Sequence, residues 1–389
     1  MKRDVRAERI RNLPPYLFAE IDRIKGELRR EGVDLIDLSI GDPDLPTPAR
    51  IIDRLAEAAR TASNHRYPSY NGSERFREAV ATWYRDRFGV VLDPATEVLA
   101  LIGSKEGLAH APLAFLDPGA VALIPSIAYP VYATATAFAG GESVILPVNE
   151  GNGYRPDLKS ISEEARRKAR VLFLNYPNNP TSAVADPDYF VEVAAFAERT
   201  GILVLHDAAY SEVCFDGYEP PSFLQAAGGK EVGVEFHSLS KTFNMTGWRV
   251  GFAVGNRDAI AALAKVKTNI DSGVFTAIQE ASIVALQNWK SLRDANNEIY
   301  VRRRKKGTEA LRNMGVDYYS SSATFYLWCK VPTKERSAEF CARVLRKSGL
   351  VLTPGNGFGE AGEGHFRISL TASEERLEEG LKRFSAFEA

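Results

Sequence analysis

The chain has 389 residues, of which 45% are hydrophobic and 25% charged, a composition typical of globular proteins. Its formal net charge of −1 provides no long-range attraction for nucleic acid or for an anionic membrane, so we expect neither as a partner. The 3 cysteines and 5 histidines lack the spacing of a disulfide framework or a metal site, so we expect no metal.

The N-terminal stretch is basic but has no apolar core of a signal peptide, and no apolar run is long enough to span a bilayer. We therefore expect a cytoplasmic protein. The length favours one large domain and one smaller domain. Residues 1–44 carry a predicted helix at 16–30 and do not share the pattern that follows them.

Between residues 98 and 255, short apolar runs alternate with helical patterns. Runs of this kind, rich in Val, Ile and Leu, are typical of strands that are covered on both faces of a mostly parallel sheet. The fold class we predict is therefore α/β, with a mostly parallel seven-stranded sheet in the large domain. The seven predicted strands are 98–103, 121–125, 143–147, 171–177, 202–207, 232–240 and 249–255.

The pattern changes after this region. Residues 258–313 read as helical, and a smaller α+β part follows with predicted strands at 325–331, 350–354 and 365–370. We predict a large domain at 45–285. The small domain is expected to be discontinuous, formed by 1–44 and 286–389 and including a long connecting helix.

Polar residues follow the predicted strands, at the sheet edge where ligands of such folds bind. Ser104 and Lys105 open a helix after 98–103, where free N–H groups suit a phosphate, although a plain helix cap is an equal alternative. Tyr129 follows 121–125 and offers a flat ring for a planar ligand, but a core tyrosine is the simpler interpretation of this residue alone.

The next strands end in an amide and an acid. In "NYPNNPT" (175–181), two prolines fix the loop that presents Asn179, which is either a hydrogen-bonding group or a turn former. Asp207, with Tyr210 after it, ends an apolar strand, where a carboxylate is costly without a cation or several donors.

The last strands bring a lysine with hydroxyls around it. Lys241 follows Ser238 and Ser240, and Arg249 lies eight residues further on. A snorkelling surface lysine is the usual alternative. Together, however, the strand ends supply phosphate donors, a ring, an amide, an acid and an amine. This set suits pyridoxal 5′-phosphate, whose pyridine nitrogen requires an acidic partner.

Three motifs carry a resemblance to a known family. "NYPNNPT", "DAAY" (207–210) and "SLSKTFNMTGWR" (238–249) resemble, in order and spacing, motifs of the class I/II aminotransferases of fold type I, and the resemblance covers essentially the whole chain. It implies that Lys241 binds the cofactor covalently, that Asp207 pairs with the pyridine nitrogen, and that these two residues and Tyr210 are catalytic. The other implied cofactor contacts are Tyr129 on the ring, Asn179 and Tyr210 on the 3′-oxygen, and Ser104, Lys105, Ser238, Ser240 and Arg249 on the phosphate.

The same resemblance implies a site shared between two subunits and an arginine that binds the substrate. Tyr67, in "RYPSYNG", is similar to the family tyrosine that reaches a phosphate across a dimer interface, which implies a homodimer. Arg367, in "FRISL", looks like the arginine that binds the substrate α-carboxylate, with Asn179 and Gly41 beside the substrate. A guanidinium fork suits a carboxylate, whereas a surface ion pair is the interpretation without that context.

The implied reaction is ping-pong transfer of an amino group between an amino acid and a 2-oxo acid. Stretches such as "YPSYNGSERFREAV" and "VLTPGNGFGEAGEGHFRISL" resemble the LL-diaminopimelate aminotransferases, which use glutamate and 2-oxoglutarate on the route to lysine. A broader aminotransferase for alanine, aspartate or aromatic amino acids is the alternative. A cofactor-binding regulator of DNA lacks support because no DNA-reading region precedes the fold, and "GNGFG" (355–359) does not open the helix of a dinucleotide site.

Overall fold

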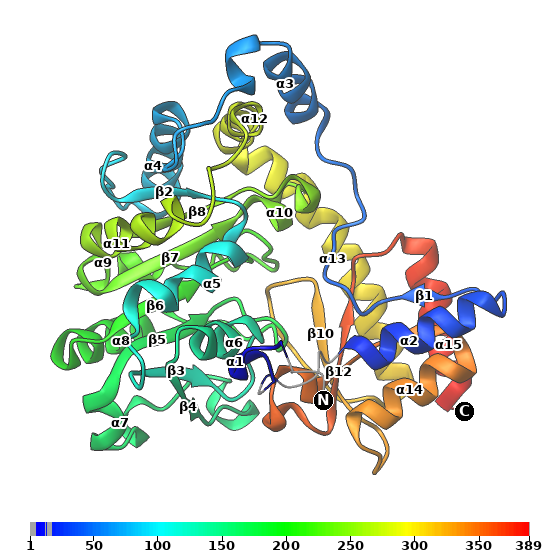
Figure 1. Cartoon of the computed structure of the whole chain (residues 1–389). Helices are drawn as coiled ribbons and strands as arrows, with labels where there is room; N and C mark the ends of the chain where they lie inside the picture. Colours follow the sequence, from blue (N-terminus) through cyan, green and yellow to red (C-terminus); the bar gives the residue numbers. More distant parts are fainter. Residues whose placement is uncertain (1–4, 12, 14–17, 389) are drawn as a thin grey trace.

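A seven-stranded sheet forms the centre of the computed structural model, which describes residues 5–11, 13 and 18–388 (Figure 1). The strand order is β2-β8-β7-β6-β5-β3-β4, and only β8 runs antiparallel to its neighbours. The predicted fold class and the seven predicted strands are confirmed. The strands are β2 (Val98–Leu101), β3 (Val121–Pro125), β4 (Glu142–Leu146), β5 (Ala169–Asn175), β6 (Leu203–Asp207), β7 (Gly233–Ser238) and β8 (Gly251–Gly255).

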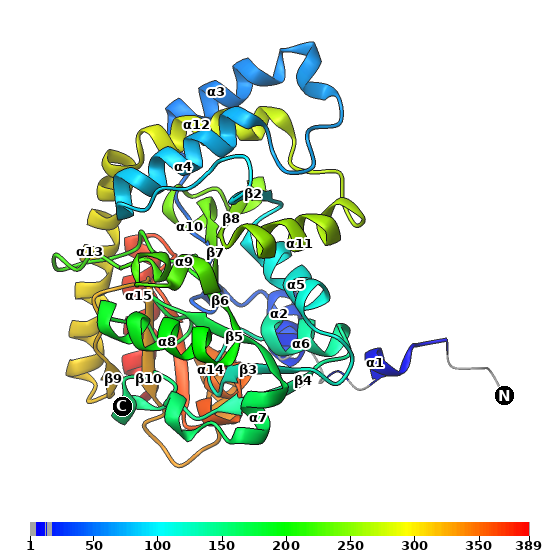
Figure 2. The same cartoon turned by 90° about the vertical axis from the view of Figure 1, so that its left-hand side faces the viewer.

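Helices cover both faces of this sheet (Figure 2). Successive side chains of a strand point to opposite faces, so Val98 of β2 enters one apolar core and Leu99 the other. The first core includes α4 (Glu74–Phe88) and α8 (Pro187–Thr200), and the second includes α5 (Ser104–Phe115), α6 (Val131–Phe138) and α11 (Arg257–Thr268). Shorter helices are α7 (Glu163–Lys168), α9 (Gly229–Val232) and α10 (Leu239–Thr242).

A second, antiparallel sheet lies in the C-terminal part, in the order β12-β13-β10-β9. Its strands are β9 (Tyr318–Tyr319), β10 (Tyr326–Lys330), β12 (Thr353–Pro354) and β13 (His365–Ser369), and α14 (Ser337–Ser348) and α15 (Glu374–Glu388) accompany them. The predicted single strand at 350–354 is wrong: β11 (Leu350–Val351) pairs with β1 (Ile36–Asp37), while β12 pairs with β13. The segment divides because its two halves have different partners.

The N-terminal segment lies against this C-terminal part. Helix α2 (Phe18–Arg30) packs on α14, and β1 runs parallel to β11. The rest of the predicted helix 16–30, residues 16 and 17, lies outside the described residues. The remaining N-terminal helices are α1 (Glu8–Arg11) and α3 (Ala49–Ala59). The domain boundaries, 45–285 against 1–44 with 286–389, stay a prediction.

The predicted helical stretch 258–313 is confirmed as helical and consists of three helices. They are α11, α12 (Thr276–Gln287) and the long α13 (Trp289–Asn313). The break between α11 and α12 includes Gly273, whose φ of +89° favours glycine. None of the helices among the described residues is both long and apolar enough to cross a membrane.

A buried cation joins α11 to α5. The ammonium of Lys267 has no exposed surface, donates to both carboxylate oxygens of Asp271 at 2.7 and 2.9 Å, and lies 3.5 Å from Oε1 of Glu106. His110 Nδ1 is 2.7 Å from the same Glu106 oxygen. Lys267 therefore supplies positive charge beside the carboxylates of Glu106 and Asp271, which together with His110 form a cluster of potential metal ligands.

We predict that Lys267→Met destabilises the protein by about 3–5 kcal/mol, because it leaves two acidic groups without their buried cation. Urea unfolding of the variant measures this loss. Lys168→Met is the control, since Lys168 pairs with Glu164 on an exposed helix surface and its loss should change the unfolding midpoint little. Equal unfolding midpoints for the two variants would contradict the prediction.

Candidate functional site

A buried acid lies at the C-terminal end of β6. The carboxylate of Asp207 accepts a hydrogen bond from the hydroxyl of Tyr132 at 2.8 Å and a longer one from the amide of Ala209 at 3.3 Å. Both donors are neutral. Burial raises the pKa of Asp207, while the bonds from Tyr132 and Ala209 oppose the rise. The site therefore holds a carboxylate that a cationic ligand atom would stabilise.

Sequence reasoning did not identify Tyr132. This residue lies on α6, three positions after Tyr129, and its ring stacks on Phe173 of β5 at a centroid distance of 4.8 Å. The rings of Tyr129 and Tyr132 meet edge to face at 6.0 Å. Tyr129 lies just before α6, so no helical periodicity linked the two tyrosines in the sequence.

Lys241 lies next to the segment that joins β1 to α3. Its ammonium donates to the carbonyl oxygen of Gly41 at 2.6 Å. Burial lowers the pKa of Lys241 to about 8; Asp42 opposes this, and the positive charges of Arg249 and Arg367 add to it. Gly41 has to be glycine, because a Cβ there would overlap the hydroxyl of Tyr326. The structure thus brings together Lys241 and Gly41, which are 200 positions apart in the chain.

Arg367 of β13 is buried and held on three sides. Its Nη1 donates to Oδ1 of Asn179 and its Nη2 to the carbonyl oxygen of Ser39, both at 2.5 Å. The guanidinium carbon lies 4.2 Å from the ring centroid of Tyr326 and 4.9 Å from that of Phe358. Its Nε has no hydrogen-bond partner among the described residues. This arginine is therefore a buried, oriented cation rather than a member of a surface ion pair.

The loop after β5 is fixed by Asn175, a second residue that sequence reasoning did not single out. The side chain of Asn175 accepts from the amide of Asn179 at 2.8 Å and donates to the carbonyl oxygen of Asp207 at 2.7 Å. The peptide bonds Tyr176–Pro177 and Asn179–Pro180 are both cis. The amide side chain of Asn179 is therefore presented from a loop that is hydrogen-bonded to the end of β6.

Tyr210, three residues after Asp207, is also buried. Its hydroxyl lies 2.8 Å from the hydroxyl of Tyr326, the residue that packs against both Gly41 and Arg367. Burial raises the pKa of Tyr210 well above its ordinary value, so the hydroxyl stays protonated and available as a donor.

The predicted phosphate contacts gather where α5 begins. Ser104 is the first residue of α5, and a Cβ on the preceding Gly103 would overlap Nη2 of Arg249, so this guanidinium lies against the helix start. Arg249 has a left-handed φ of 53° and donates to the carbonyl oxygen of Thr246 at 2.7 Å. Helix N-termini and guanidinium groups both favour anions.

The other predicted phosphate residues differ in exposure. Ser238 caps α10 by accepting from the amide of Ser240 at 3.2 Å, and Ser240 is buried. Lys105 is exposed, and its ammonium lies 5.7 Å from the ring centroid of Tyr129.

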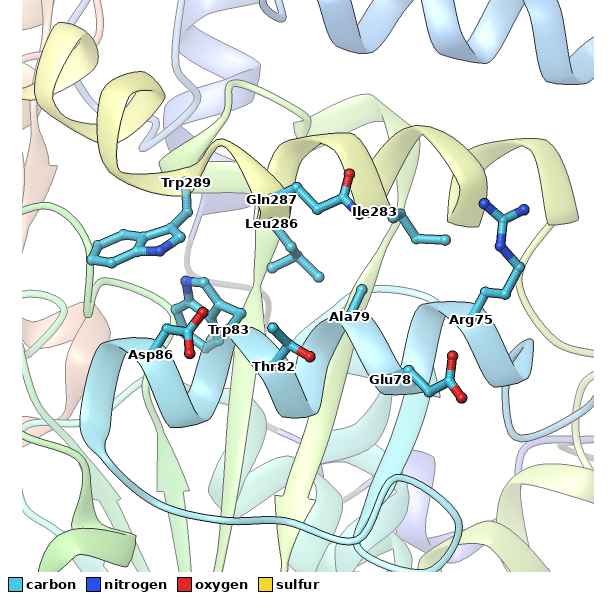
Figure 3. Close-up of a pocket in the computed structure, with 10 residues that line it drawn as sticks. All are labelled: Arg75, Glu78, Ala79, Thr82, Trp83, Asp86, Ile283, Leu286, Gln287 and Trp289. Carbon is cyan, nitrogen blue, oxygen red and sulfur yellow. The ribbon is translucent and has the colours of Figure 1, made fainter.

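Tyr67 does not join these residues within the chain. It is 88% exposed, in a loop whose neighbouring Ser69 lies against Gly273. The hollow of about 400 Å³ shown in Figure 3 is also separate: it lies between α4 and α12, with Trp83, Ile283 and Trp289 in its wall, and no predicted site residue lines it. A second hollow, of about 630 Å³, lies beside Ser126 and is likewise lined by no predicted site residue.

Comparisons with known proteins agree on one family. The sequence pattern described as aminotransferase class I and II matches residues 33–384. An LL-diaminopimelate aminotransferase of Syntrophobacter fumaroxidans is 55% identical over 97% of this chain and 98% of its own, and that of Halothermothrix orenii is 52% identical over 97% of each. The structure of substrate-bound BacF from Bacillus subtilis is similar with a TM-score of 0.95 at 36% identity, over 99% and 98% of the chains.

We predict that the amine of Lys241 becomes reactive near pH 8, where half of it is neutral. The protein is first treated with hydroxylamine to remove any bound aldehyde. It is then exposed to brief pulses of acetic anhydride at increasing pH, and mass spectrometry quantifies each acetylated peptide. Lys168 is the internal control, because Glu164 raises its pKa. A half-point for Lys241 at or above that of Lys168 would contradict the prediction.

Proposed function

The chain belongs to the aminotransferase class I and II family, and on this basis we propose that it transfers the amino group between LL-diaminopimelate and 2-oxoglutarate, with pyridoxal 5′-phosphate as cofactor. The substrate assignment is supported by relatives with that name that are 51–55% identical over nearly their whole length. The aspartate and aromatic aminotransferases among the similar structures are 29% and 32% identical. The broader specificity is therefore not favoured.

The observation that carries the cofactor assignment is that the C-terminal ends of neighbouring strands β6 and β7 lead to a buried acid, Asp207, and a buried amine, Lys241. A buried carboxylate with only neutral donors suits a protonated pyridine nitrogen, and an amine with a pKa of about 8 suits covalent attachment to an aldehyde. Ser104 and Arg249 at the start of α5, with Ser238, Ser240 and Lys105, would hold the phosphate. Tyr129 would stack on the ring, and Asn179 and Tyr210 would bind its 3′-oxygen.

When bound, pyridoxal phosphate supplies the electron sink that stabilises negative charge on the substrate α-carbon. The chain's own residues bind the substrate and move its proton. Arg367 binds the α-carboxylate, oriented by Asn179 and by the ring of Tyr326. Nζ of Lys241 takes the α-proton and delivers it to the cofactor side, and a pKa of about 8 suits an amine that does both near neutral pH.

The same proposal includes a homodimer with shared sites. Tyr67 is exposed, and Ile270 and Phe275, on the loop that packs against its own, are 54% and 37% exposed. Exposed apolar groups beside a polar site favour burial against a partner surface. We assign Tyr67 to the phosphate of the second subunit.

With 2-oxoglutarate as the acceptor, we expect the purified protein to have a higher kcat/KM for LL-diaminopimelate than for alanine, aspartate, tyrosine or phenylalanine, each tested as the sole amino donor. Formation of glutamate measures every rate. Lys241→Ala is the matched control and should reduce turnover by at least about a thousandfold, since it removes the nucleophile and base. Preference for another donor would overturn the substrate assignment, and full activity of Lys241→Ala would overturn the mechanism.

The shared site predicts complementation between two inactive chains. In a mixed dimer of Lys241→Ala and Tyr67→Ala chains, one site has both mutations and the other has neither. Co-expression should restore about a quarter of wild-type activity, since half of the dimers are mixed and each has one complete site. Activity no higher than that of Tyr67→Ala alone would contradict the assignment of Tyr67.

A further inference from the structure

The ring of His206 is held in one tautomer by its two neighbours. His206 lies on β6 with no exposed surface, and its Nε2 is 3.2 Å from the backbone amide of Tyr176, which donates. An amide N–H cannot accept a hydrogen bond, so Nε2 carries no proton and the ring proton lies on Nδ1. Nδ1 is 2.8 Å from Oε1 of Glu235 and donates to it.

Glu235 is the buried group that imposes this arrangement. It lies on β7 directly opposite His206, and its other oxygen accepts hydrogen bonds from the hydroxyls of Tyr84 and Ser222. Burial opposes ionisation, but the hydrogen bonds from His206 and Ser222 lower the pKa of Glu235 below its ordinary value. An ionised carboxylate only accepts, so the proton of the histidine stays on the side that faces Glu235.

The amide that His206 holds belongs to the loop of the substrate site. Tyr176 is the first residue after β5, and the loop that it begins presents Asn179. Oδ1 of Asn179 in turn accepts from Nη1 of Arg367. The buried contacts thus run without interruption from Glu235 on β7, through the imidazole and the loop, to the guanidinium.

We propose that His206 is a positioning residue for substrate binding: its Nε2 lone pair, presented by Glu235, fixes the amide of Tyr176 and so sets Asn179 against Arg367. This inference rests on the proposed role of Arg367 in binding the substrate carboxylate. The simpler alternative is that His206 serves only as a hydrogen-bond donor to the buried Glu235.

Two substitutions separate these roles, because each new side chain keeps the hydrogen bond of one ring nitrogen and loses that of the other. In His206→Asn, the side-chain NH2 lies near the place of Nδ1 and keeps a donor for Glu235, but nothing accepts from Tyr176. In His206→Gln, the longer side chain brings Oε1 to the place of Nε2 and keeps the acceptor, but Glu235 loses its donor.

For the holoenzyme we expect His206→Asn to raise the KM for 2-oxoglutarate about five- to tenfold, with a smaller change in kcat, as the loss of one buried hydrogen bond would. His206→Gln should retain a KM near that of the wild type. Calorimetric titration of each holoenzyme with 2-oxoglutarate should show the same order of affinities, and thermal unfolding should show His206→Gln as the less stable of the two.

A normal KM in His206→Asn, or an equal or larger rise of KM in His206→Gln, would overturn the proposal in favour of the role as a donor to Glu235. If His206→Asn does not fold, His206→Gln decides alone: a wild-type KM supports the proposal and a raised KM overturns it. A wild-type protein that transaminates no 2-oxo acid would instead refute the proposed function, so the two failures are distinguishable.

Discussion

The carboxylate of Asp207 is placed where it is most costly, at the end of a central strand with only a phenol and an amide as donors. An ionised group in such a position needs a positive charge close by, and no charged donor of the described chain hydrogen-bonds to it. The parallel strands on either side end in Asn175 and in the Ser238 turn. Protonation or a nearby cation would relieve this cost, and the pyridine nitrogen of the proposed cofactor is a cation of the required kind.

The cations of the site are under the opposite constraint. Lys241, Arg249 and Arg367 repel one another, and burial removes water from the lysine. A neutral amine relieves both costs, which is the electrostatic reason why Lys241, rather than an arginine with its much higher pKa, suits the nucleophilic role proposed for it. Carbonyl oxygens of residues 39 and 41 partly compensate the remaining charge.

The apolar runs of the sequence were sufficient to predict the seven central strands. Six of them are largely buried on both faces and have a continuous apolar pattern, whereas β4, at the sheet edge, is mostly exposed. The motifs singled out Asp207, Lys241 and Arg367, all of which the structure places in buried positions, while their roles stay a prediction. Tyr132 and His206 were not found, because a buried tyrosine or histidine in an apolar run looks the same whether it fills the core or orients a neighbour. Nor did periodicity reveal that 350–354 divides between two sheets, since strand pairing depends on distant partners.

Four consecutive backbone carbonyls, at residues 38–41, join the beginning of the chain to its end. They accept hydrogen bonds from Ser369, Arg367 with Thr353, Thr371 and Lys241, in that order. The donors at residues 353–371 are synthesised long after residues 38–41. A nascent chain that has only reached Lys241 lacks Arg367, and the burial that lowers the pKa of this lysine is incomplete. Closure of the pocket, and with it the lowered pKa of Lys241, is consequently a late event of biosynthesis.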